Sequence, residues 1–162
     1  MQKLTTNEIE DLKKLKPIDK LIRIIKILRD PVRGCPWDLR QNYDTLSNFP
    51  IEEAYELQEA ILNKNIDNIK EELGDLLLQV VLFSQIGEEK KDFSFEDVVD
   101  AISNKLIIRH PQIFDKKYKK NDKPEDTWEQ IKQNNKVNSL RNNFISLLDD
   151  IPKNLPSMQK SI

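Results

Sequence analysis

Four carboxylates in two short segments are the residues of this sequence best suited to chemistry. Glu53 and Glu56 stand three residues apart in IEEAYE, and Glu72 and Asp75 stand three apart in EELGD. On an α-helix, residues at this spacing share one face, one turn apart. Carboxylate oxygens bind hard divalent cations, so the pattern predicts a site for Mg²⁺ or Mn²⁺, with Ca²⁺ also open.

On a helical wheel, both pairs lie on the apolar side of their helices. At about 100° per residue, Ala60 lies within about 20° of Glu53, and Gln79 and Phe83 lie within about 20° of Glu72. Glu53 and Glu72 are therefore expected to point inward, and the second carboxylate of each pair to lie at the edge of the apolar arc. Converging buried carboxylates repel one another and lose hydration, and a divalent cation removes both costs.

Two other interpretations compete with a metal site. Acidic pairs at this spacing are common on solvent-exposed helices, so one pair alone says little. Salt bridges to Lys105 or Arg109 would also neutralise the charge. Two inward-facing pairs on consecutive helices favour the cation over both alternatives.

Composition narrows the chemistry further. The single histidine, His110, and the single cysteine, Cys35, cannot build a typical zinc site, which leaves oxygen ligands. A net charge of −2, from 26 basic and 28 acidic residues, argues against a general nucleic-acid-binding protein. No apolar run is long enough to span a membrane, no signal-like stretch opens the chain, and one cysteine fits a reducing compartment. We therefore expect a cytoplasmic protein that binds neither nucleic acid nor membrane.

The elements that must position the carboxylates are all expected to be helices. We expect a polar, loosely packed N-terminal arm over residues 1–16 and one catalytic domain over residues 17–162. No segment alternates with period two, which predicts an all-α fold, a helical bundle. Proline, glycine and capping residues predict a helix that opens at Pro17 and is ended by Asp30-Pro31, and a loop at 31–38. Further helices are expected at about 39–47, 50–64, 65–89 and 94–109, with a short last helix from Thr127.

The same residues resemble a known family. EExxE, followed after 15 residues by ExxD, resembles the metal motif of the MazG family of nucleoside triphosphate pyrophosphohydrolases, within the all-α NTP pyrophosphatase superfamily. The stretch LRDPVRGCPWDLRQ resembles the N-terminal signature of that family. Later blocks follow in the family's order over about residues 20–160, namely ELGDLLLQVVLFSQ, KLIIRHPQIF, WEQIK and DDIPKNLPSM.

The resemblance implies a helical bundle that assembles as a homodimer or higher homo-oligomer. It implies a Mg²⁺-dependent enzyme, with Mn²⁺ as a possible substitute, that hydrolyses an NTP or dNTP to the nucleoside monophosphate and pyrophosphate. By motif, the metal ligands would be Glu53, Glu56, Glu72 and Asp75, and Glu53 or Glu56 would orient the attacking water. Substrate contacts would come from Lys105, Arg109, Trp128 and Lys70, the last standing near Asn68, where some members place a lysine.

Three alternatives remain beside this interpretation. A ferritin-like di-iron protein needs Glu-x-x-His on two helices, and one histidine argues against it. A dUTPase-like enzyme would share the carboxylates but not GCPWD or HPQIF. A non-catalytic nucleotide-binding or helical interaction module fits the sparse charge at Ile107-Ile108, where the family usually carries more, but not the four intact carboxylates.

Overall fold

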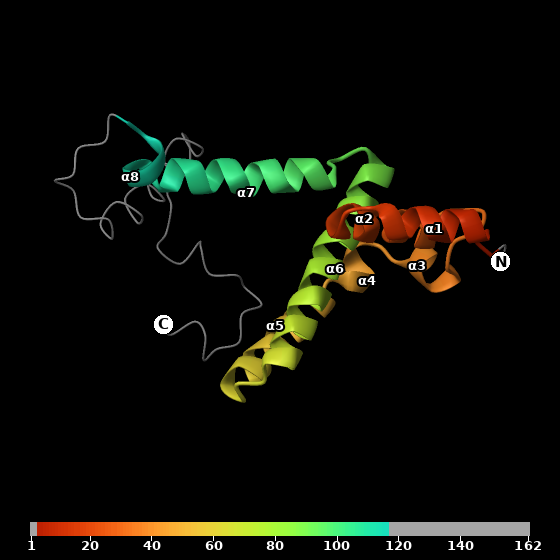
Figure 1. The fold of residues 1–162 in the computed structure, drawn as a ribbon, viewed down its shortest axis with the longest axis horizontal. Coiled ribbons are helices and arrows are strands. Elements are labelled where there is room, and N and C mark those ends of the chain that lie inside the picture. The colour runs from red at the N-terminus through yellow and green to blue at the C-terminus, as the bar shows by residue number, and fades with distance from the viewer. Residues whose placement is uncertain (1–2, 117–162) are drawn as a thin grey trace. The chain divides into compact units, whose positions relative to one another are not determined.

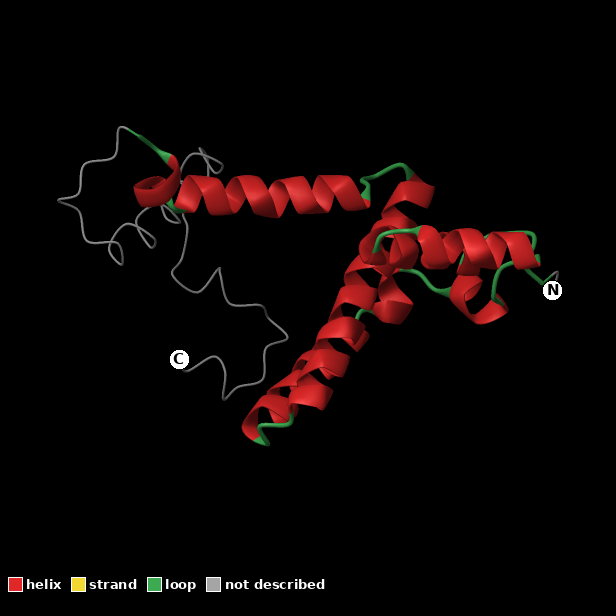
Figure 2. Ribbon diagram, in the orientation of Figure 1, coloured by secondary structure: helices red, strands yellow, loops and turns green. Residues whose placement is uncertain are grey.

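All regular structure in the described part of the chain is helical. The computed structural model describes residues 3–116, and Figure 2 shows only helices and loops there. The fold class expected from the sequence is confirmed for these residues, whereas Trp128 and the expected last helix lie outside them. The helices in Figure 1 are α1 (Thr6–Lys14), α2 (Pro17–Leu28), α3 (Pro36–Arg40), α4 (Tyr43–Leu46), α5 (Phe49–Leu62), α6 (Ile66–Lys90), α7 (Phe95–Arg109) and α8 (Pro111–Phe114).

The chain forms two compact units, residues 1–103 and 104–162, whose boundary falls within α7. The first unit contains α1 to α6 and all four motif carboxylates, so the fold that positions them can be described from this unit by itself. No helix among the described residues is long and apolar enough to cross a membrane.

The core of the first unit lies on the C-terminal half of α6. Ile25 of α2 and Leu46 of α4 pack there with Val81, Leu82 and Ile86, all nearly inaccessible to solvent. Further apolar side chains from α2, α5 and α7 surround this cluster. A helix that is apolar nearly all round must be covered on several sides, so the LLLQVVLFSQI sequence accounts for its central position.

The N-terminal half of α6 pairs instead with α5 in a helical hairpin (Figure 1). The connection is only residues 63–65, so the two helices must run antiparallel. Lys64 adopts a left-handed conformation with φ 52°, and the Asn65 side chain caps α6 by accepting a hydrogen bond from the Asn68 backbone. Both helices lie within two residues of their expected bounds.

The N-terminal segment differs from the expected loose arm because it contains helix α1. Thr5 and Glu8 form a reciprocal capping box, in which each side chain accepts a hydrogen bond from the other's backbone N–H. The Glu8 carboxylate also pairs with Arg33 at 2.7 Å. The Thr5 backbone and then Arg33 lower the pKa of Glu8 to about 2. The Thr-x-x-Glu spacing was the available sequence signal for this helix start.

The segment expected as one helix over 39–47 is two helices. The first, α3, starts within the expected loop at Pro36, and α4 begins after Asn42, whose side chain accepts hydrogen bonds from the Asp44 and Thr45 backbones. The preceding turn needs Gly34, since a Cβ there would collide with the carbonyl oxygens of Asp30 and Leu28.

Arg29 links this turn to α6 through hydrogen bonds. Arg29 is 8% exposed, and its guanidinium donates to both carboxylate oxygens of Glu89, at 2.8 and 2.7 Å. It also donates to the backbone carbonyls of Asp38 and Gln41. One side chain therefore joins the end of α2, the end of α6 and the C-terminal end of α3.

Replacing Arg29 with methionine should lower the free energy of unfolding by about 2–4 kcal/mol, because several charged hydrogen bonds at a buried site lose their donor. Urea denaturation of the two proteins measures this. The control is Lys26→Met on the same helix, whose 2.9 Å pair with Glu88 is exposed and should be worth under about 1 kcal/mol. Equal losses in the two variants would contradict a structural role for Arg29.

Candidate metal centre

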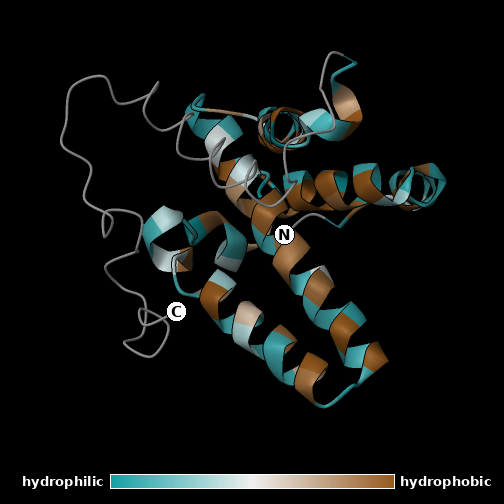
Figure 3. Cartoon of the chain, turned by 90° about the vertical axis from the view of Figure 1, so that its left-hand side faces the viewer, coloured by the Kyte–Doolittle hydropathy of each residue, from teal (hydrophilic) through white to brown (hydrophobic). Residues whose placement is uncertain are grey.

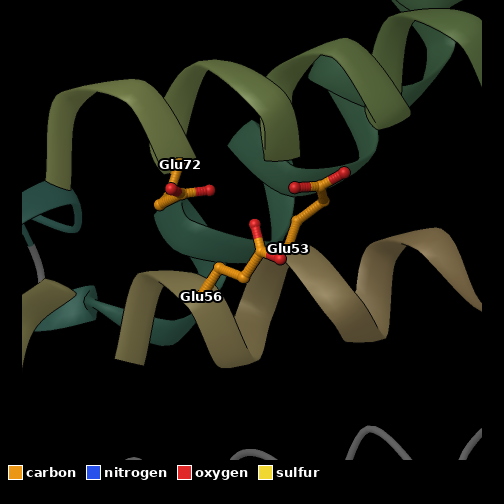
Figure 4. A group of neighbouring side chains, drawn as sticks. All are labelled: Glu53, Glu56 and Glu72. Carbon is orange, nitrogen blue, oxygen red and sulfur yellow. The ribbon is translucent and has the colours of Figure 1, made fainter. Parts of the chain in front are cut away.

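Three carboxylates converge across the α5–α6 hairpin. Glu53 and Glu56 come from α5 and Glu72 comes from α6, and Figure 4 shows all three directed into the space between the helices. Each offers an oxygen atom, and these oxygens lie within 4.8 Å of one another. The three-residue spacing sets two of them on one face of α5, and the short connection brings the matching face of α6 opposite.

The burial of these residues matches the helical wheel. Glu53 and Glu72 are half-buried, Glu56 is exposed at the rim, and Ala60 beside them is 4% exposed. The two inward carboxylates have therefore lost part of their hydration, while the rim carboxylate is open to a ligand from solvent.

Asp75 is half-buried on α6, one turn after Glu72, but the structure does not bring its oxygens into the group of three. Its negative charge nevertheless raises the pKa of both Glu53 and Glu72. The structure thus assembles three of the four expected ligands and keeps the fourth within electrostatic reach.

Burial and crowding raise the pKa of the two inward carboxyl groups. For Glu53 the largest cause is burial, followed by the charges of Asp75 and Glu56. For Glu72 it is burial, followed by Glu56 and Asp75. A nearby cation has the opposite effect on a carboxyl group and favours its ionised form. Partly dehydrated oxygen ligands without thiol or imidazole fit Mg²⁺ or Mn²⁺.

A polar hollow of about 280 Å³ opens beside this cluster. It contains no lysine or arginine, in line with Asn68 standing where some family members carry a lysine. The residues around it are Glu56, Glu59, Ala60, Asn63, Asn65, Asn68 and Glu72. The hollow was not among the sequence predictions, although two asparagines in the helix connection and a third in the first turn of α6 were a visible signal.

The expected substrate-binding residues are spread over different parts of the chain. Lys70 is exposed on α6, and Lys105 is exposed on α7. Arg109, half-buried, ends α7 and belongs with Lys105 to the second unit, residues 104–162. Trp128 lies outside the described residues. Their contacts with a nucleotide therefore stay predictions.

Fold and site together define an all-helical protein with a carboxylate centre in a helical hairpin. Residues 41–114, which contain the whole hairpin, match the MazG nucleotide pyrophosphohydrolase domain. The chain therefore contains a domain that matches the MazG family. Its fold is shared with a mazG-related protein from Thermotoga maritima, with a TM-score of 0.54 at 24% identity over 68% of this chain and 97% of that one.

Two relatives extend the comparison. The chain is 41% identical over 145 residues to the nucleoside triphosphate pyrophosphohydrolase of Escherichia coli K12, covering 89% of this chain and 54% of the relative. It is 50% identical over 96 residues to the nucleoside triphosphate pyrophosphohydrolase/pyrophosphatase MazG of Thermotoga maritima, covering 59% of this chain and 37% of that protein. The chain thus spans about half the length of the first relative.

The raised pKa values predict how the metal-free protein responds to pH. The folded protein holds protons on Glu53 and Glu72 more tightly than the unfolded chain does, so stability falls as pH rises from the ordinary value of 4.5 through the raised values. In EDTA at pH 7, Glu72→Gln should therefore melt at a higher temperature than the wild type, and the difference should disappear near pH 4. Circular dichroism melts across this range provide the measurement.

The control is Glu10→Gln at an exposed position of α1, whose charge does not contribute to the raised pKa of Glu53 or Glu72, and it should change the melting temperature little at either pH. A Glu72→Gln protein that melts below the wild type at pH 7 in EDTA would show that the cluster is not repulsive.

Proposed function

We propose that the chain is a Mg²⁺-dependent nucleoside triphosphate pyrophosphohydrolase that converts an NTP or dNTP to the monophosphate and pyrophosphate. The observation that carries this proposal is the convergence of Glu53, Glu56 and Glu72 within the residues that match the MazG domain. The names of the relatives from Escherichia coli and Thermotoga maritima support the substrate class.

The carboxylates would hold the cation and leave one side open to substrate. Glu53, Glu56 and Glu72 would be ligands, with Asp75 as the fourth. When bound, Mg²⁺, or Mn²⁺ in its place, stabilises negative charge on phosphate oxygens and lowers the pKa of a bound water. Exposed Glu56 lies on the rim, where protein and substrate oxygens can meet.

The remaining steps belong to side chains of the protein. Glu53 or Glu56 orients the water that attacks the α-phosphorus and accepts its proton, and pyrophosphate leaves. Lys105, Arg109 and Lys70 neutralise the phosphates, because the charged side chains that line the hollow are all carboxylates. Trp128 contacts the nucleotide. The polar hollow beside Glu56 and Glu72 offers amide groups to the same substrate.

The function is tested by pyrophosphate release from a panel of NTPs and dNTPs. The Glu53→Gln protein should lose about 10²-fold or more of its Mg²⁺-dependent turnover, because a ligand and proton acceptor is replaced by a neutral amide. EDTA should abolish turnover by the wild type. Glu88→Gln, the same change at an exposed position of α6, is the control and should keep near wild-type turnover.

Undiminished turnover in Glu53→Gln would remove Glu53 from the site, and no metal-dependent turnover with any nucleotide would favour a non-catalytic module. Activity confined to dUTP would instead favour the dUTPase-like alternative.

We further propose that a second copy of the chain covers the outer side of α6. Leu73, Leu77 and Val80 are 52%, 40% and 42% exposed, and they lie about 80–140° around the helix from Glu72. Figure 3 shows hydrophobic and hydrophilic residues alternating along the hairpin. An exposed apolar stripe of this kind is typical of a protein interface.

We also propose a cytoplasmic location for the protein, because the single cysteine Cys35 fits a reducing compartment.

The double variant Leu73→Glu/Leu77→Glu should be monomeric where the wild type is a dimer or larger, because four charges per dimer would enter the interface. Light scattering coupled to gel filtration measures this. Val32→Glu, at an isolated apolar residue that is 87% exposed, should keep the wild-type assembly. A wild type that is itself monomeric at high concentration would refute the proposal.

A further inference from the structure

Gln79 is a buried amide beside the carboxylates, and only one of its two polar atoms makes a hydrogen bond. It lies on α6, one turn beyond Asp75, and is 6% exposed. Its Nε2 donates to Glu53 Oε1 at 3.5 Å, at the long end of the hydrogen-bond range. Its Oε1 is also buried and accepts no hydrogen bond from the residues that the structure describes. Such an atom costs free energy unless a donor reaches it.

The orientation of the amide follows from its neighbour. An ionised carboxylate can only accept hydrogen bonds, so the NH₂ group of Gln79 must face Glu53. The amide oxygen then lies on the other side of the same planar group, where it is buried. The buried polar side chain of Ser84, further along α6, behaves differently, since its Oγ donates to the Val80 carbonyl at 2.7 Å.

The chemical character of the side chain suits a cation site. A carboxylate at this position would add to the repulsion that already raises the pKa of Glu53 and Glu72, and a lysine would take the place of the cation. An apolar side chain would pack in the helix interface without any unpaired atom. A neutral group with one donor and one acceptor is the choice that constrains Glu53 without changing the net charge.

We propose that Gln79 is a positioning residue of the metal centre. Its Nε2 holds the Glu53 carboxylate in place, and its Oε1 accepts a hydrogen bond from a water ligand of the cation. The oxygen of such a water faces the cation, so its hydrogens point outward and need acceptors, which Gln79 supplies together with the carboxylates. This inference rests on the proposed function. It adds Gln79 as the residue that orients both the ligand Glu53 and the water bound to the cation.

The test measures Mn²⁺ binding directly, by electron paramagnetic resonance of free Mn²⁺, in the full chain without nucleotide. Gln79→Met keeps the length of the side chain and removes both polar groups. It should weaken Mn²⁺ binding by about 10- to 100-fold, as expected when a partner of a metal ligand is lost. Its melting temperature in EDTA should equal or exceed that of the wild type, because an unpaired buried polar atom has been removed.

The matched control is Gln85→Met. Gln85 lies on the same helix and also donates to a glutamate, Glu89, at 3.2 Å, but away from the cluster. Its loss should leave Mn²⁺ binding unchanged. Gln79→Leu replaces Gln79→Met as the test variant if the methionine protein does not fold.

A double-mutant cycle with Glu53→Gln separates positioning from packing. If Gln79 acts through Glu53, its replacement should weaken Mn²⁺ binding much less in the Glu53→Gln background than in the wild type. Equal losses in both backgrounds would overturn the inference, as would unchanged Mn²⁺ binding by Gln79→Met. In either of those cases, a wild type that binds Mn²⁺ and releases pyrophosphate keeps the proposed function. A wild type that binds no Mn²⁺ and releases no pyrophosphate with Mg²⁺ would remove the proposed function itself.

Discussion

Repulsion between like charges at the α5–α6 interface is the constraint around which the first unit is organised. Glu53, Glu56 and Glu72 approach one another where part of their hydration is lost, and burial and mutual repulsion raise the pKa of the inward pair. The opposing attraction lies at the other end of α6, where Ile25, Leu46 and the apolar half of the helix bury one another. The C-terminal half of α6 thus contributes the apolar core that stabilises the unit, and its N-terminal half contributes to the carboxylate cluster.

Two buried polar side chains in this unit show how structural and functional groups can be told apart. Arg29 has all of its strong contacts within the protein, to Glu89 and to two backbone carbonyls, so its burial is compensated without any ligand. Gln79 donates one long hydrogen bond, and its amide oxygen accepts none from the described residues. The first arrangement stabilises a fold, and the second is complete only when something else is bound.

Local rules explain how much the sequence could predict. The bounds of α5 and α6 and the inward turn of Glu53 and Glu72 follow from helical periodicity and capping, and the structure agrees with both. The Thr5–Glu8 capping box and the Asn42 cap obey equally local rules but were overlooked, so α1 was missed and two helices were merged into one. Partners across helices, such as Gln79 for Glu53, depend on tertiary packing, which periodicity does not encode.

The short connection at residues 63–65 has a consequence for how the centre forms. All four motif carboxylates lie between residues 53 and 75, so only a small loop must close to bring them together. Contacts this close in sequence form early and rapidly during folding, before distant segments have found their places. The chain therefore meets the repulsion among these carboxylates at the beginning of folding, and a cation that binds the nascent hairpin would speed its formation as well as serve the finished protein.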